Sequence, residues 1–324
     1  MLVFFRSSNT LVVVVILLAG VLTWLNVLNG TEAPLNDRYG AFLFQVFTRW
    51  LDMIPGFYTW LAFLMMFVVA SILIYANARL HLNDKISYLP ALCYILLIGG
   101  VPIIQEFNPV IVSTLILAAV IVHLTGSFEN EQISYRYFNV SVLISIGTFF
   151  FQYLYLYMIV VWVVILLWRP GYWREWVFSL LGFAFPLFIT FSWFFLVEGD
   201  LSPMGQHFSK MFNIQRITPL ISTSTTLFFV SIIVLVVLAF GQVWRNISSK
   251  KTAIRTGYYL LILVVLVTLL MVLIIPDTMP QVWYFMACPL SLFLSNFLAN
   301  VKSKRIGVIV LTLLFVLTTI QMIM

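Results

Sequence analysis

Long apolar runs separated by short polar connections dominate the pattern of this 324-residue chain. A helix needs about 20 apolar residues to cross the hydrocarbon core of a bilayer. Because backbone polar groups in lipid must be satisfied within the segment, these runs predict helices. We expect eleven spans, at residues 10–28, 58–77, 87–104, 109–125, 138–152, 154–168, 176–196, 221–243, 257–275, 281–299 and 306–323.

The apolar stretch over 138–168 is longer than one span requires. Gly147, Thr148 and Gln152 interrupt it. We therefore predict a break into two short or tilted helices, with a single span as the alternative.

The longest polar interruption is the segment 29–57, between the first and second spans. Within it, residues 39–54 place most apolar side chains on one helical stripe: Phe42, Phe44, Val46, Phe47, Trp50, Leu51 and Ile54. This pattern predicts a helix lying in the membrane interface, with its charged residues toward water. The alternative is a connector whose helix fills a gap between spans.

The composition agrees with the pattern, since 63% of the residues are hydrophobic and 9% are charged. The predicted fold class is an all-α, polytopic transmembrane helical bundle, and residues 1–324 form one integral membrane domain without a linker. The apolar run near the N-terminus exceeds a signal-peptide core and lacks a small-residue cleavage site. We interpret it as a retained first helix.

The net charge of +6 does not indicate nucleic-acid binding, because the basic residues occupy short connections between spans. With eleven spans and a cytoplasmic N-terminus, the cytoplasmic side holds 13 of the 17 Lys and Arg residues. A single span over 138–168 would give at best 11 to 6. The positive-inside rule therefore favours eleven spans in an inner membrane.

The acidic residues lie mainly on the other side in this topology. Seven of the eleven are expected outside: Glu32, Asp37, Asp52, Glu106, Glu198, Asp200 and Asp277. The two longest connections, 29–57 and 197–220, are also expected outside, whereas the cytoplasmic connections are short. We therefore expect any reaction site on the outer face.

Several function classes are disfavoured. The chain has no nucleotide-binding motif and no metalloprotease or hydrolase motif. Its three histidines, His81, His123 and His207, are too few for haem or copper redox chemistry. The spans contain almost no charge, which disfavours ion-coupled transport. Cys93 and Cys288 lie inside spans and are expected to be core residues.

Two acids are candidates for catalysis. Asp37 follows the first span, where a carboxylate could act as a general base or help to hold a divalent cation such as Mg²⁺ or Mn²⁺. Glu106 lies in the tight outer turn between the third and fourth spans. The structural alternatives are a surface turn at Asp37 and a helix N-cap at Glu106.

A third candidate is the basic segment of the second long outer connection. His207, Lys210 and Arg216 are the kind of donors that recognise a phosphate group. The alternative is a solvated loop with ordinary interfacial cations.

This order of parts resembles the GT-C superfamily of membrane glycosyltransferases. Asp37 would match the acid of the first outer loop, Glu106 the acid of the second, and Lys210 or Arg216 the cation that meets the donor phosphate. The resemblance implies transfer of a sugar, with inversion, from a polyprenyl phosphate donor on the outer face. It implies membrane lipid and a lipid-linked sugar as partners, and no nucleic acid. The chain has a single acid in Asn36-Asp37-Arg38, where the family often has a pair.

Two other functions remain open from the sequence. A non-enzymatic subunit of an envelope assembly or secretion complex would lack converging acids on its outer surface. A transporter for lipid or a small solute would have discontinuous helices around a midplane cavity. Gly99-Gly100-Val101-Pro102 and Ala184-Phe185-Pro186 are the candidate breaks.

Overall fold

The computed structural model describes residues 10–29, 40–51, 57–80, 87–125, 134–168, 171–199, 223–246, 252–275, 279–301 and 304–323, with Ser202, Gly205 and Ser209. The first half contains α2 (Thr10–Asn29), α3 (Phe42–Leu51), α4 (Phe57–Arg79), α5 (Leu89–Gly99), the 3₁₀ turn η1 (Pro102–Ile104), α6 (Pro109–Thr125) and α7 (Ser134–Thr148). The second half contains η3 (Gln152–Tyr157), α8 (Met158–Trp168), α9 (Trp173–Trp193), η4 (Phe194–Glu198), α11 (Thr223–Asn246), α12 (Thr252–Ile274), α13 (Met279–Asn300) and α14 (Lys304–Ile323).

The distribution of side chains is that of a membrane protein. Large apolar residues are exposed on the outer helices, with Leu196 and Leu273 each 77% exposed. Hydroxyl residues such as Ser113, Ser141 and Ser291 are fully buried between helices. Helices that associate in lipid have no hydrophobic reason to bury their apolar faces, so small and polar residues gather at their contacts. The predicted all-helical class is confirmed for the described residues, and this distribution of side chains supports the predicted membrane location.

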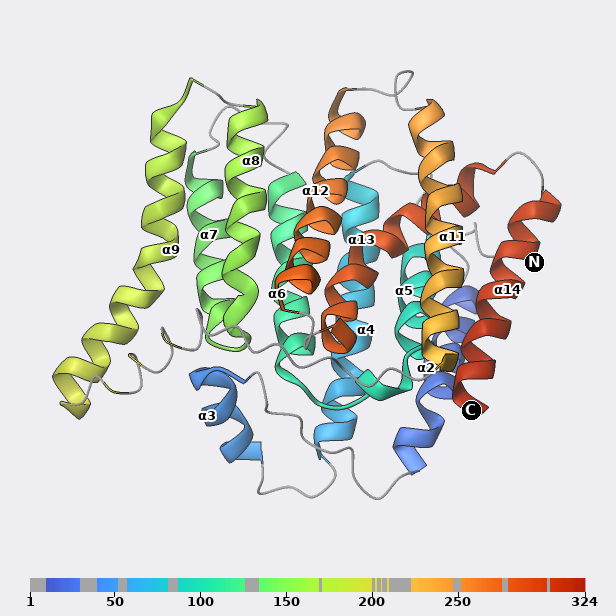
Figure 1. Ribbon diagram of the computed structural model, residues 1–324, viewed down its shortest axis with the longest axis horizontal. Helices are drawn as coiled ribbons and strands as arrows, with labels where there is room; N and C mark the ends of the chain where they lie inside the picture. The colour runs from blue at the N-terminus through green and yellow to red at the C-terminus, as the bar shows by residue number, and fades with distance from the viewer. Residues whose placement is uncertain are drawn as a thin grey trace.

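Each predicted span overlaps a helix in the described residues. Six helices are long and apolar enough to cross a membrane, and four apolar segments are shorter. The predicted break in 138–168 is present: α7 ends at Thr148, η3 follows, and α8 begins at Met158. Figure 1 shows α7 and α8 as neighbours that run in opposite directions.

The third predicted span, 87–104, is too long at its C-terminal end. Its helix, α5, ends at Gly99, because Gly99 and Gly100 favour termination and Pro102 starts a 3₁₀ turn. All residues of α5 are buried, and α2, α4, α13 and α14 pack around it. At about 16 Å, α5 is shorter than the hydrocarbon core.

Two prolines lie inside helices. The candidate break at Pro186 is wrong, because α9 continues from Trp173 to Trp193 through this residue. Proline is tolerated in a membrane helix when neighbouring groups satisfy the freed backbone, and the result is a bend. Figure 1 shows α9 changing direction along its length. It also shows α13, which has Pro289 at its middle, with its second half turned away from the first.

The bundle has two distinct ends (Figure 1). At the turn end lie α3 and the connection 101–108, and α11 and α13 begin there. At the opposite end, which we call the arginine end, α4, α6 and α11 finish and α7, α9 and α12 begin. The terminal turns at the arginine end carry Arg79, Arg136, Arg174, Arg245 and Arg255.

Candidate functional site

The connection 101–108, which carries Glu106, is built by local sequence signals at both of its ends. The Gly100 N–H donates to the Leu96 carbonyl and closes α5. At the other end, the Asn108 side-chain oxygen accepts a hydrogen bond from the Ile111 N–H at 3.0 Å, and Pro109 is the first residue of α6. Asn108 is therefore the N-cap of α6, a role that the sequence alternative gave to Glu106.

Long-range hydrogen bonds fix the same turn. Gln105 donates from Nε2 to the Thr23 carbonyl of α2 at 3.1 Å and to the Gly99 carbonyl at 3.4 Å. The Tyr284 hydroxyl of α13 donates to the Ile104 carbonyl at 3.0 Å. These donors are buried, so breaking their bonds would leave polar groups unsatisfied in an apolar interior. The turn is therefore held rigidly between α2 and α13.

Two glycines let neighbouring helices approach the turn closely. A Cβ atom on Gly99 would lie 2.6 Å from the Thr23 side chain of α2. A Cβ atom on Gly100 would lie 2.0 Å from the Phe228 ring of α11. Both distances are far below van der Waals contact, so α2 and α11 reach the turn only because these positions lack a side chain.

Glu106 projects from this fixed turn at the turn end of the bundle. Its side chain is half-buried, and its carboxylate interacts electrostatically with Tyr284. The Glu106 carbonyl accepts a hydrogen bond from the Asn108 side chain at 3.2 Å. Both neighbours of Glu106 in the sequence, Gln105 and Phe107, are buried and held in place, so the position of the acid is defined by its surroundings.

Helix α3 packs under the same turn. The Ala41 and Leu43 N–H groups donate to the carbonyls of Phe150 and Phe149 at 3.0 and 2.9 Å. These bonds satisfy donors at the start of α3 that have no partner within the helix. An isolated bridge joins Gly40 to Phe151. The start of α3 is thus anchored on the break between α7 and α8.

An aromatic cluster, made of Phe44, Phe47, Tyr58 and Phe107, joins α3 to the turn. The Phe44 and Phe107 rings stack at 5.5 Å, and the Tyr58 and Phe107 rings stack at 5.4 Å. The Tyr58 hydroxyl donates to the Thr48 carbonyl of α3 at 2.8 Å. On the other face of α3, Arg49 and Trp50 are exposed. The helix expected within 39–54 is present, and its place in the membrane interface stays a prediction.

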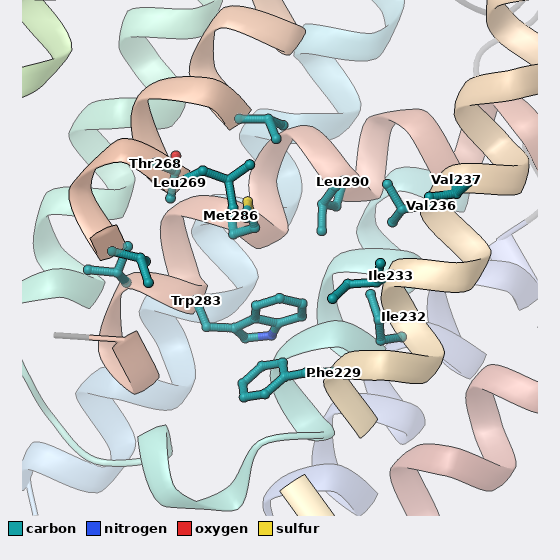
Figure 2. A pocket seen from close by; sticks show the side chains of 13 residues that line it. Phe229, Ile232, Ile233, Val236, Val237, Thr268, Leu269, Trp283, Met286 and Leu290 are labelled. Atoms are coloured by element: carbon teal, nitrogen blue, oxygen red, sulfur yellow. The ribbon is translucent and has the colours of Figure 1, made fainter. Parts of the chain in front are cut away.

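A cavity of about 340 Å³ lies between α11, α12 and α13, as Figure 2 shows. Its floor includes Trp283 and Leu290 of α13, and its rim includes Ile233 and Leu269. The hydroxyl of Thr268, a polar group in the lining, is hydrogen-bonded to Tyr157 and to the Val264 carbonyl, both at 2.7 Å. The lining is otherwise apolar, and the sequence analysis did not predict this cavity.

Trp283 connects the cavity to the turn. One side of its indole lines the cavity, where the Phe229 ring packs against it at 4.8 Å. Its Nε1 group donates to the Leu97 carbonyl of α5 at 2.9 Å. Two residues after Leu97 the helix ends and the turn begins, so one side chain contacts both features.

The profile of one protein family, described as a family of unknown function (DUF6427), matches residues 38–324. The chain belongs to the DUF6427 family. Neither the curated proteins nor the solved structures that were compared with the chain gave a match. The part of this DUF6427 member that matches contains Glu106 and the segment 207–216, and it begins one residue after Asp37.

The structure places one of the five predicted site residues. Glu106 lies on the turn described above, whereas Asp37, His207, Lys210 and Arg216 lie outside the described residues. Within the described residues, no three His, Cys, Asp or Glu side chains come together in a way that would hold a metal ion. Glu106 is therefore placed on the turn, and its convergence with Asp37 stays a prediction.

The supporting residues Gln105, Tyr284 and Trp283 were missed by the sequence analysis. Trp283 and its acceptor Leu97 are 186 positions apart in the chain, and no local pattern reports such a pairing. The tight Gly99-Gly100 pair was the available signal, because paired glycines before a proline indicate a close backbone approach as well as a helix end.

Proposed function

We propose that this DUF6427 protein is an integral inner-membrane glycosyltransferase with a GT-C-like layout. It transfers a sugar from a polyprenyl phosphate donor to an acceptor on the outer face. One observation carries the proposal: Glu106 stands on a rigidly bonded turn at the end of the bundle opposite the arginines.

The positions of the basic residues support the orientation. His123 at the end of α6 lies close enough to Arg79 and Arg136 to interact with both electrostatically. The terminal turns of α4 and α7 thus place the positive charges of Arg79 and Arg136 near the same point of the arginine end, and positively charged connections remain in the cytoplasm. In this orientation the turn end is the outer face, the N-terminus is cytoplasmic, and about eleven spans cross the membrane.

A fixed acid suits the proposed reaction. Groups that act on a transition state contribute most when their position is set before the substrate binds, because no reorganisation is then needed. Glu106 meets this requirement, since its turn is bonded to α2 and α13 and covered by α3. Its side chain is half-buried, so part of Glu106 is exposed at the turn end.

The proposed chemistry is a displacement at the anomeric carbon of the sugar. Asp37 takes the proton from the acceptor hydroxyl as its oxygen forms a bond to the anomeric carbon. The bond from that carbon to the phosphate oxygen breaks, and polyprenyl phosphate leaves with the electron pair. Lys210 and Arg216 bind the phosphate, His207 contributes a further donor, and Glu106 orients the acceptor or the sugar.

A divalent cation is not required by this scheme. Mg²⁺ and Mn²⁺ prefer several oxygen ligands, and the described residues supply no group of three potential ligands. Asp37 lies outside the described residues, so no step is assigned to a cation, and a bound Mg²⁺ or Mn²⁺ stays a prediction.

The decisive experiment is complementation of a deletion strain with charge-deleting variants. Asp37→Asn and Glu106→Gln keep the shape of the side chains but remove their charge. Loss of a positioned general base costs about 10²–10⁴-fold in rate, so we expect Asp37→Asn to insert into the membrane and fail to complement. Glu106→Gln should insert and fail as well, because it removes the charge that orients the acceptor or the sugar. Asp52→Asn, in the same outer connection as Asp37, is the matched control and should complement fully.

The variants of the basic segment separate binding from chemistry. Lys210→Ala and Arg216→Ala should weaken the donor interaction and be rescued in part by a higher donor level. Full complementation by both acid variants would reject the transferase and favour a non-enzymatic subunit. A transporter is less well supported, because the cavity between α11 and α13 is apolar and opens at the rim rather than enclosing a polar midplane site.

A further inference from the structure

We propose that the cavity between α11, α12 and α13 binds the isoprenoid chain of the lipid-linked donor, which enters sideways from the bilayer between α11 and α12. The identity of the lipid rests on the proposed function. The site itself rests on the position, the lining and the connections of the cavity.

The cavity opens toward lipid. Its rim residues Ile233 and Val237 on α11 are 60% and 63% exposed, and Leu269 on α12 is 42% exposed. The neighbouring exposed positions on both helices, such as Val234 and Leu273, are also apolar. A surface of this kind faces the hydrocarbon core, so a lipid chain reaches the cavity without crossing water.

The depth of the cavity matches one leaflet. Its lining on α11 extends from Phe229 to Val237, which corresponds to about 12 Å of helix. Half of a hydrocarbon core of about 30 Å is about 15 Å. This lining runs from the first third of α11 to just past its middle, the α12 lining lies toward the end of α12, and the α13 lining lies toward the start of α13. The cavity thus occupies the leaflet next to the turn end, where Glu106 lies.

The lining is suited to the hydrocarbon chain of a lipid rather than to its headgroup. No charged residue lines the cavity, and the Thr268 hydroxyl is already hydrogen-bonded. β-branched residues such as Ile232 and Val236 form much of the wall, and their side chains have few alternative rotamers. A stiff wall of methyl groups with two aromatic rings, Phe229 and Trp283, offers an irregular surface that suits a methyl-branched chain better than a straight acyl chain.

A chain in this cavity would lie against the residue that supports the turn. Trp283 contacts the cavity with its ring and holds α5 through the Leu97 carbonyl. Phe228, beside Phe229, packs on Gly100 at the start of the turn. The headgroup of a lipid held here would emerge at the turn end, on the side where the proposed transfer takes place.

Photocrosslinking in phosphatidylcholine nanodiscs tests this site. One sample contains polyprenyl phosphate with a diazirine in its chain, and a parallel sample contains phosphatidylcholine with a diazirine in an acyl chain. Crosslinked residues are mapped by mass spectrometry. We expect the polyprenyl probe to label Leu269, Met286 and Leu290 above the exposed residues Val234 and Leu273, and excess unlabelled polyprenyl phosphate to remove this labelling.

A pair of variants on α11 tests occupancy directly. Val236→Phe adds a ring to the lining, whereas Val234→Phe makes the same change at a position that is 54% exposed and outside the lining. Labelling of the cavity should fall about tenfold in the first variant, as expected for the loss of about two buried methylene contacts, and stay unchanged in the second. Val265→Phe on α12 repeats the test if Val236→Phe does not insert.

Two results would overturn the proposal: labelling of the cavity no stronger than that of Val234 and Leu273, or equal labelling of the cavity by the phosphatidylcholine probe. Glu106→Gln separates this proposal from the proposed function. It should keep the cavity labelling and fail to complement. Complementation by Glu106→Gln with selective labelling would reject the role of the acid and leave the chain site standing.

Discussion

Glycines without room for a side chain determine how closely the helices of this bundle approach one another. Gly99 and Gly100 admit α2 and α11 to the turn, and Gly182 admits α9 to α7. In lipid such contacts replace the hydrophobic effect as a source of helix association, because close approach increases dispersion contacts. The packing of these helices therefore depends on single glycine positions.

Of these three glycine positions, Gly182 is the one whose surroundings can adjust least to a side chain. A Cβ atom there would lie 2.4 Å from the Phe138 carbonyl oxygen of α7, which is backbone and cannot rotate away. We expect Gly182→Ala to destabilise the protein by about 1–3 kcal/mol, measured as a lower midpoint of thermal unfolding in detergent. Gly241→Ala on α11, where a Cβ atom meets nothing within 4 Å, is the control and should cause no loss.

Gln105 gives a second prediction at this scale. Gln105→Met keeps the length of the side chain but removes the donor to the Thr23 and Gly99 carbonyls. A lost buried hydrogen bond costs about 1–3 kcal/mol, so amide hydrogens in 101–108 should exchange faster with solvent. The same change at Gln242, a half-buried position on α11, should leave that exchange unaltered. Unchanged exchange in Gln105→Met would mean that the turn is held by other contacts.

Among single residues, the sequence identified the acid Glu106 but not the side chains that hold its turn in place. Glu106 stands out because charges are rare and the turn is short. Gln105, Tyr284 and Trp283 gave no such signal, since their partners are up to 186 positions away. Hydrogen bonds between distant segments depend on how the helices pack, which no local pattern encodes.

Among the elements, the helices were predictable and their faces were not. Hydropathy located the helices, and Gly147 with Gln152 indicated the break between α7 and α8. Helix α12 is apolar on all sides, so the sequence does not distinguish the face toward lipid from the face toward α13. The cavity lies where the face of α12 toward lipid meets its face toward α13, so the sequence could not predict it. The break predicted at Pro186 was wrong because a membrane helix can continue through a proline with a bend.

Helix α3 was predictable because its polar and apolar faces differ. Its fully buried Phe44 stacks on Phe107 of the turn. Replacing a buried phenylalanine by alanine costs about 3–5 kcal/mol, more than a short docked helix is expected to withstand. We therefore predict that Phe44→Ala releases α3, seen as faster hydrogen exchange or proteolysis within 41–51 while the spans stay protected.

Trp50→Ala is the matched control for this prediction. Trp50 lies on the same helix, but it is 75% exposed and lies outside the aromatic cluster. Its removal should leave exchange in 41–51 unchanged. Equal effects of the two changes would mean that the membrane, rather than the aromatic cluster, holds α3 in place.

For the whole molecule, the distribution of charge and the position of the site depend on one orientation. The arginine end gathers basic residues from α4, α7, α9, α11 and α12, whereas the turn end holds Glu106 and α3. If the arginine end is cytoplasmic, the turn, the cavity and the proposed donor all belong to the outer leaflet. In the inverted orientation the site would face the cytoplasm, and the polyprenyl-linked donor would have to be used on that side.

Cysteine accessibility in intact cells decides between these orientations. Thr252→Cys introduces a thiol at the exposed start of α12, and Ser202→Cys introduces one in the connection between α9 and α11. The native Cys93 and Cys288 are fully buried and should contribute little background. We expect an impermeant maleimide to label Ser202→Cys in intact cells, and Thr252→Cys only after the membrane is permeabilised. Thr252 lies at the arginine end, close to Arg255 in the sequence. Labelling of Thr252→Cys from outside would therefore show that the arginine end faces outward, and the proposed site would then face the cytoplasm.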